Sequence, residues 1–248
     1  MNVQTQIRRT AAAEALLSAY TERSAALPGD AKVIEGREEA VSLLQRGLPN
    51  RKVEAWHYTD LRRLLSTVPA FDAGRPAAPR APLLEGSVVL PVLNGVAGTP
   101  PAIDGVAVSK VADRLSDGSL APLLGLEGTD DTVSAINAAF AADGFVVDVP
   151  AGIKAAAPIE LQNIQAGGQV HTRFAVTVGE GANATFVERQ TGEGDAFVSS
   201  VSHLRVDDDA EVLWLILQEQ PEGANHLGRI NLTIGKRRSE ERRVGKEC

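Results

Sequence analysis

The feature that most constrains the fold is a sequence repeat with an offset of 28 residues in the second half of the chain. Residues 178–186 align with residues 206–214, and each copy is a short β-type run that follows a Gly- or Asp-rich turn. A fixed period built from strands and turns is typical of a solenoid, in which like residues of successive coils stack on one another. The repeat therefore predicts a parallel β-helix over residues 145–235, with Phe186 beneath Trp214.

The alignment extends beyond the two clear copies. Gln190 aligns with Gln218, and a weaker earlier copy begins at Val149. The competing interpretation is an antiparallel sandwich in which two hairpins happen to resemble each other. The two interpretations differ in strand direction, because stacked coils pair in parallel whereas hairpins pair antiparallel.

The first half of the chain has a different character. Ala11, Ala15, Leu16 and Ala19 recur at helical spacing and predict one helix face, and residues 132–142 predict a later helix that is capped at its start. The chain is thus predicted to be mainly β. Its parts are an N-terminal helical region at 1–68, a Pro/Gly-rich connection with a short strand and a helix at 69–144, the partial β-helix at 145–235, and a tail at 236–248.

Charge and composition exclude several classes of protein. The formal charge is −7, and the basic tail leaves an even more acidic body, which argues against nucleic-acid binding. The single cysteine, Cys248, allows no internal disulfide. No run approaches the roughly 20 apolar residues that span a bilayer, and the N-terminus lacks the apolar core of a signal peptide. The sequence predicts a cytoplasmic protein that does not enter a membrane.

No motif in the sequence indicates a catalytic, metal or cofactor site. The histidines His57, His171, His203 and His226 occupy different repeat positions and lack metal-ligand spacing, which favours hydrogen-bonding roles. The sequence contains neither a phosphate-binding loop nor a nucleophile elbow. We therefore expect no catalytic residue, no metal ligand and no bound cofactor, and the absence of cysteines from residues 1–235 argues against a conventional iron–sulfur cluster site.

Three further patterns have structural explanations. The acidic run 207–209 could suggest a cation site, but consecutive residues cannot all face one ion, and the aligned coil has Gly-Glu-Gly there. We therefore predict a solvated turn. The Gly-Glu-Gly segments 179–181 and 192–194 also predict turns. Every residue in 212–217 is apolar, so both faces of the predicted strand are apolar. The outward stripe of Leu213, Leu215 and Leu217 is therefore expected either to be covered or to promote aggregation.

Residues 48–61, which include Arg-Lys-Val-Glu-Ala-Trp and Tyr-Thr-Asp, resemble the N-terminal signature of the SufD family. Residues 136–152 are similar to the entry of that family's β-helix, and 178–182 to one of its coils, although both features are shared with the paralogous subunit SufB. The resemblance implies a non-catalytic scaffold in iron–sulfur cluster assembly, a right-handed β-helix flanked by helical domains, and two partners, a SufB-like subunit and a SufC-like ATPase.

The same resemblance implies that family members are longer, so the chain is expected to be truncated before the helical region that binds the ATPase and before the family's functional histidine. None of the four histidines inherits that role. Residues 238–248 resemble the translation of a sequencing adapter and are expected to be non-native, with a genuine basic tail as the alternative. The part played by Trp56 and Tyr58 stays open between anchoring the helices and contacting a partner. Two other functions also stay open, a β-helix enzyme acting on polysaccharide or acyl donors and a SufB-like cluster scaffold.

Overall fold

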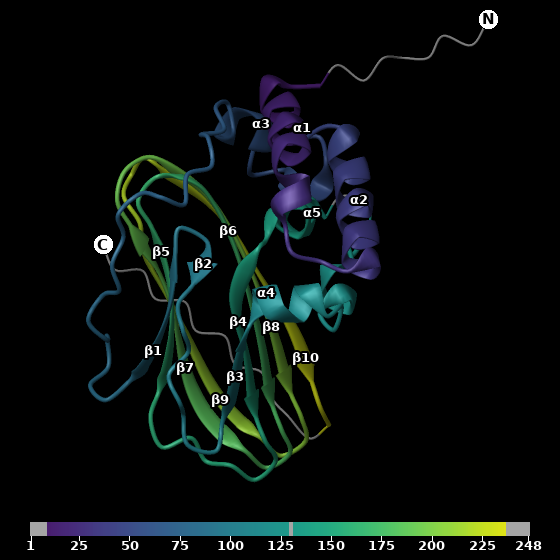
Figure 1. The fold of residues 1–248 in the computed structure, drawn as a ribbon. Helices are drawn as coiled ribbons and strands as arrows, with labels where there is room; N and C mark the ends of the chain where they lie inside the picture. The colour runs from purple at the N-terminus through teal and green to yellow at the C-terminus, as the bar shows by residue number, and fades with distance from the viewer. Residues whose placement is uncertain (1–8, 129–130, 237–248) are drawn as a thin grey trace, which may run out of the picture.

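The computed structural model describes residues 9–128 and 131–236, and it shows two long sheets that face each other with the helices gathered on one side (Figure 1). From Asp143 onward the chain runs alternately through one sheet and then the other, so two strands and two turns make one coil. The result is a mainly β protein with a β-solenoid of about three turns, preceded by N-terminal helices.

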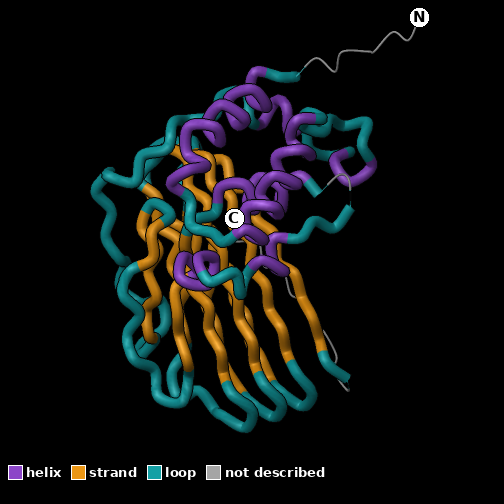
Figure 2. The backbone as a smooth tube through the Cα atoms, turned by 45° about the vertical axis from the view of Figure 1, so that its right-hand side comes forward, coloured by secondary structure: helices purple, strands orange, loops and turns teal. Residues whose placement is uncertain are grey.

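Each sheet has five strands. The first has the order β2-β1-β5-β7-β9, and its strands span Val96–Ala97, Val88–Leu93, Ile159–Gln165, Asn183–Gly192 and Glu211–Glu219. The second has the order β10-β8-β6-β4-β3, and its strands span Ala224–Ile234, Ala196–Val206, Gly168–Val178, Asp143–Val149 and Ala107–Lys110. Figure 2 shows the strands of the second sheet running side by side down the molecule.

The strand register confirms the repeat. Phe186 pairs with Trp214 in a parallel ladder between β7 and β9, and Val178 pairs with Val206 between β6 and β8. The two aromatic rings stack with their centroids 5.2 Å apart. Because β4 through β10 pair with one another in parallel, the antiparallel sandwich is ruled out.

The solenoid includes more of the chain than the repeat predicted. β1 pairs in parallel with β5 and so adds a strand from the segment predicted to be a connection. It turns back into β2 through Asn94 and Gly95, whose φ values of 47° and 81° fit a tight hairpin turn. β3 pairs antiparallel with β4 at one edge of the second sheet, and no sequence pattern predicted this strand. β1 and β3 are both short, and the sequence of a short strand does not specify which strand it pairs with.

The helices begin where capping residues place them. Thr10, Asp30, Asp60 and Asp131 accept hydrogen bonds from backbone N–H groups in the first turns of α1, α2, α3 and α5. The helices span Ala11–Arg23 (α1), Ala31–Gln45 (α2), Leu61–Leu64 (α3), Val111–Ser116 (α4) and Thr132–Phe140 (α5), with 3₁₀ turns at Ser24–Ala26, Glu54–Trp56 and Ala121–Leu124. None of these helices is long and apolar enough to cross a membrane.

The helices share one apolar core, separate from the interior of the solenoid. On α1 the buried residues are Ala12, Ala13 and Leu16, so the predicted face was rotated, and Ala11 is exposed. Every residue of α5 except Val133 is buried, because the helix lies between α2 and the outer face of the second sheet. The helices are therefore packed on the solenoid, and α5 connects the two cores.

The Pro-rich segment between α3 and β1 runs along the outer face of the first sheet. The backbone N–H groups of Leu83 and Arg80 donate to Glu160 and Gln162 on β5, at 2.7 and 2.9 Å. Arg189 on β7 donates to the Ala81 carbonyl oxygen at 2.9 Å. This segment, residues 70–87, covers outward-facing side chains that would otherwise be exposed, and we call it the strap.

Candidate functional site

The interior of the solenoid is divided into an apolar half and a polar half. The apolar half contains stacked rings and branched side chains, such as Phe145 on Phe174 and Ile159 beneath Phe186. Two residues further along the same strands, the side chains stacked in successive coils are Leu161, Glu188 and Ile216. Two residues further on, it holds three amides, Asn163, Gln190 and Gln218. The amide stack shows that polar groups are also placed in register by the repeat.

Glu188 is a carboxyl group buried in this polar half. It accepts hydrogen bonds from the Ser202 hydroxyl at 2.9 Å and from the Gln190 amide at 2.8 Å. Burial raises the pKa of Glu188, and the hydrogen bonds from Ser202 and Gln190 oppose that shift only in part. It forms no ion pair among the described residues. An unpaired buried carboxyl is favoured in its neutral form, which can donate a hydrogen bond.

A chain of hydrogen bonds links the amides to a histidine. Asn163 donates to Gln190 at 2.8 Å, and Gln190 lies 3.4 Å from the Ser200 hydroxyl. That hydroxyl lies 2.8 Å from His226 Nε2, and His226 Nδ1 lies 3.0 Å from Gln218. The chain thus runs from β5 to the last described coil, where Gln218 is exposed to solvent. A continuous polar path therefore joins the buried amides to the end of the solenoid.

The contact between Ser200 and His226 brings together two residue types that can form a nucleophile pair, which sequence reasoning did not find. Its surroundings do not favour that chemistry. Burial lowers the pKa of His226 to about 4, so the ring is a weak base. The group on Nδ1 is the neutral amide of Gln218, which cannot stabilise an imidazolium as a carboxylate does. The arrangement supports hydrogen bonding within the interior.

A second polar cluster lies on the outer face of the second sheet, beneath the helices. Asn137 of α5 donates to the carbonyl oxygens of Thr172 and Ser199, at 2.8 and 3.2 Å, and accepts from Arg173 Nε at 3.0 Å. Arg173 also contacts His203 Nε2 at 3.2 Å. Since these partners belong to α5 and to neighbouring strands, the cluster fixes the helices on the sheet.

The four histidines therefore have different surroundings. His171 is buried, lies 2.8 Å from the Ser199 hydroxyl, and stacks on Phe140. Burial lowers the pKa of His171 to about 3 and that of His203 to about 4. His57 is exposed next to Tyr58. Within the described part of the chain, no three His, Cys, Asp or Glu side chains are grouped to hold a metal ion. Cys248 lies outside the described residues, as do residues 237–248 of the tail.

The acidic run 207–209 lies in the turn between β8 and β9. Asp207 pairs with Arg205 at 2.8 Å, and Asp208 accepts from the backbone N–H of Lys236 at 2.6 Å. Asp209 has a φ of 56°, a turn conformation that Asp tolerates better than most residues. The carboxylates of Asp207 and Asp208 thus have separate partners, as expected for a turn.

The last described coil presents an apolar edge. β9 pairs with β7, and β10 pairs with β8, but no described strand pairs with the far edge of either. Leu213 is 53% exposed and Ile216 is 51% exposed. Leu215 and Leu217, predicted to need a cover, are partly buried on the side where the strap runs. Ile216 shares the inward alternation of Trp214, but no described strand covers it from the next coil position.

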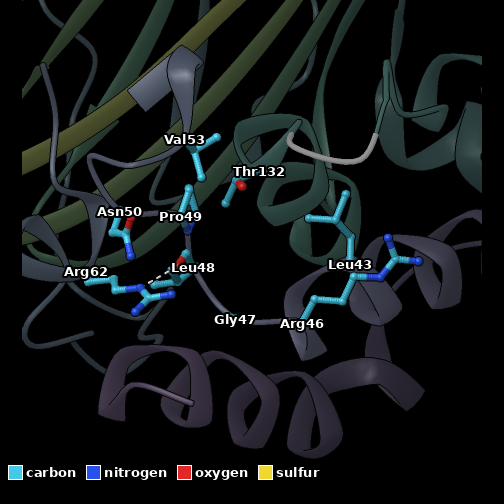
Figure 3. Close-up of a pocket in the computed structure, with 9 residues that line it drawn as sticks. All are labelled: Leu43, Arg46, Gly47, Leu48, Pro49, Asn50, Val53, Arg62 and Thr132. Atoms are coloured by element: carbon cyan, nitrogen blue, oxygen red, sulfur yellow. Dashed lines mark hydrogen bonds between the residues drawn. The ribbon is translucent and has the colours of Figure 1, made fainter. Parts of the chain in front are cut away.

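The first residues of the N-terminal signature, 48–50 and 53, line part of a surface pocket (Figure 3). The pocket has a volume of about 190 Å³ and lies between the end of α2, the following loop, α3 and the start of α5. Trp56 packs against the helical core, whereas Tyr58 is 92% exposed. The two aromatic residues of the signature therefore differ, one anchoring the helices and one available to a partner.

Together these features define a stacked parallel solenoid whose interior is half apolar and half polar. It has an open edge, and no catalytic group is assembled among the described residues. Residues 161–243 match the family model described as SUF system FeS cluster assembly, SufBD core domain. The match covers about a third of the chain, from within β5 through β10, and it supports a relation to the SufB/SufD family. A search of curated proteins finds no match.

Proposed function

We propose that this chain is a SufD-like scaffold subunit of a SufB–SufC–SufD-type complex for iron–sulfur cluster assembly, and that it is not catalytic by itself. The observation that carries the proposal is the match of the solenoid strands to the SufBD core domain. The signature at residues 48–61 supports the SufD-like assignment over a SufB-like one. The partners are then a SufB-like subunit and a SufC-like ATPase, and the location is the cytoplasm.

The interior supports a scaffold more than a β-helix enzyme. Such an enzyme needs charged side chains that converge on an accessible groove. Here the buried carboxyl of Glu188 faces Ser202 and Gln190, and the Ser200–His226 contact involves a weakly basic ring. A SufB-like cluster scaffold would need thiolate ligands, which residues 1–235 lack. The chain is therefore proposed to contribute shape and contacts, with no cofactor of its own.

The test is co-expression of the chain with SufB-like and SufC-like subunits, followed by affinity purification through a tag on this chain. A stable complex at fixed stoichiometry, whose reconstitution raises the rate of cluster transfer to an apo-ferredoxin, is the expected result. Co-expression with the ATPase alone is the matched control. Failure to recover the SufB-like subunit contradicts the proposal, and so does stoichiometric cluster binding by a purified Cys248→Ser variant of the chain alone.

A further inference from the structure

The pocket at the N-terminal signature is lined by two kinds of group. Its walls are apolar at Leu43, Leu48, Pro49 and Val53, and polar at the remaining lining residues, Arg46, Gly47, Asn50, Arg62 and Thr132. Figure 3 shows Asn50 and Arg62 at one end of the pocket, and Leu43 and Arg46 at the other. A volume of about 190 Å³ is below the roughly 300–1,000 Å³ of typical small-molecule sites, and it suits one or two side chains of a peptide.

Two of the polar side chains are held in place by the backbone around them. Arg62 Nε donates to the Leu48 carbonyl oxygen at 2.6 Å, which fixes the guanidinium plane. The Asn50 amide oxygen accepts from the Lys52 N–H at 2.9 Å, which fixes the amide. Among the described residues, the terminal amino groups of Arg62 and the Asn50 NH₂ group have no hydrogen-bond partner. The pocket thus presents oriented donors, the arrangement that carboxylates and phosphates require.

The charge around the pocket is opposite to that of the rest of the molecule. Residues 46–63 contain five Arg or Lys and only two acidic residues, whereas residues 1–235 together carry a net charge of −10. No ion pair of the described residues involves any member of this segment. Within the described residues these cations therefore have no ion-pair partner. A partner segment with carboxylates would complement both the charge and the donors.

We propose that this pocket, which we call the signature pocket, binds an acidic peptide segment of a partner protein. A carboxylate of that segment contacts Arg62 and Asn50, and a neighbouring apolar side chain lies on Leu48 and Pro49. The exposed ring of Tyr58, in the same signature, extends the contact surface beyond the pocket. The inference rests on the helical region and stands whether or not the solenoid acts as proposed above.

A long polyanion is the competing ligand, and two observations disfavour it. The pocket is too small for a nucleotide, and the acidic body repels an extended chain of phosphates. A short acidic segment avoids this repulsion because all of its charges can lie against the basic residues around the pocket. The choice between peptide and nucleic acid can be made by direct comparison of the two.

The experiment measures fluorescence anisotropy of the full chain with a short labelled peptide in which Glu and Leu alternate. Peptides with Gln or Lys in place of Glu serve as probe controls, and a labelled single-stranded oligonucleotide serves as the competing ligand. We expect saturable binding of the Glu peptide alone, weakened by added salt. Absence of saturable binding overturns the proposal, and so does tighter binding of the oligonucleotide.

Two substitutions test the residues. Arg62→Ala removes the oriented guanidinium, and Asn50→Asp replaces the donor with a negative charge while still accepting from the Lys52 N–H. Each is expected to weaken peptide binding about tenfold or more. The matched control is Arg63→Ala, which removes a cation of the same helix that does not line the pocket. Melting temperatures verify folding of each variant. An equal loss in the Arg63 variant would reduce the site to a nonspecific basic patch and defeat the proposal.

Discussion

The two halves of the solenoid interior are built by the same rule with opposite chemistry. In the apolar half, Phe186 stacks beneath Trp214, and in the polar half Gln190 stacks beneath Gln218, four residues further along the same pair of strands. Both stacks follow from parallel pairing in register. The comparison teaches that a solenoid repeats whatever side chain occupies an inward position, whether its burial is favourable or costly. Burial of rings stabilises the fold, whereas burial of polar groups must be offset by hydrogen bonds.

The polar half is incompletely satisfied. Buried polar atoms without a hydrogen-bond partner include Asn163 Oδ1, Gln165 Nε2 and Thr172 Oγ1. Each unpaired buried group costs about 1–3 kcal/mol. At the stacked rings of the apolar half, the one such atom named for the described residues is the indole Nε1 of Trp214. Substitutions in the two halves should therefore have effects that differ in both size and pH dependence.

The largest effect is expected in the apolar half. Phe186→Ala removes a fully buried ring and leaves a cavity beneath Trp214, which should lower the free energy of unfolding by about 3–5 kcal/mol. Urea denaturation followed by Trp fluorescence and circular dichroism measures the change. Tyr58→Ala, at an exposed ring, is the control and should change it by less than about 0.5 kcal/mol. Similar losses for both variants would show that the stacked rings are not the main source of stability.

Glu188→Gln tests the polar half. Because burial raises the pKa of Glu188 above its ordinary value of 4.5, the folded state holds this proton more tightly than the unfolded state. The stability that this bound proton contributes is fully present below pH 4.5, and it is lost as the pH rises through the pKa of Glu188 in the folded state. The Gln variant should therefore be as stable as the unchanged protein in acid and more stable at pH 8.

Denaturation curves at a series of pH values measure the difference. The free-energy difference between the two proteins should grow with pH, at no more than about 1.4 kcal/mol per pH unit for one proton. Two parallel curves would contradict the prediction, since they would mean that Glu188 gains or loses no proton on folding.

His226 should have the opposite pH dependence. Burial lowers its pKa to about 4, below the ordinary value of 6.5, so the unfolded state binds the proton more tightly. Stability from this group is present above pH 6.5 and is lost as the pH falls toward 4. His226→Gln should reduce that acid-induced loss by about 2–3 kcal/mol, measured from denaturation at pH 7.5 and 4.5. Since burial also lowers the pKa values of His171 and His203, part of the loss should remain.

The smallest effect on stability is expected at the open edge. Replacing Leu213 and Ile216 together with Ser should change the free energy of unfolding by no more than about 0.5 kcal/mol per residue, because both are half exposed. The same variant should shift the chain from aggregate toward monomer in size-exclusion chromatography. Ile34→Ser, at a residue of α2 that is 49% exposed, is the control. If that control reduces aggregation equally, the open edge is not the source of the association.

The sequence determined the coil register because the repeat is local and periodic. Each strand carries its own inward positions, and the turn of Gly or Asp between strands fixes the offset, so the parallel stack could be predicted before the structure was known. The helix caps were predictable to within one residue, as Thr59 or Asp60 and as Asp131 or Thr132, and the structure has Asp60 and Asp131, since a capping side chain acts within one turn of its own backbone.

The candidate site was less predictable. Glu188 and Gln190 share the inward alternation of Phe186, which was the only available signal, but polar residues in a strand usually face solvent. The Ser200–His226 contact joins residues on different strands, and the amides of Asn50 and Asn137 reach their partners through loop and helix geometry. No spacing in the sequence specifies such contacts.

By itself, then, the sequence determined the periodic part of this protein, the solenoid and its register, because that information repeats every 28 residues. Only the tertiary structure decided which nonrepeating segments close it. β1 joins the first sheet, the strap crosses the outer face, and α5 connects the helices to the second sheet. These contacts bring together residues far apart in the chain, so they depend on the packing of whole elements and on the burial of polar groups that no local pattern records.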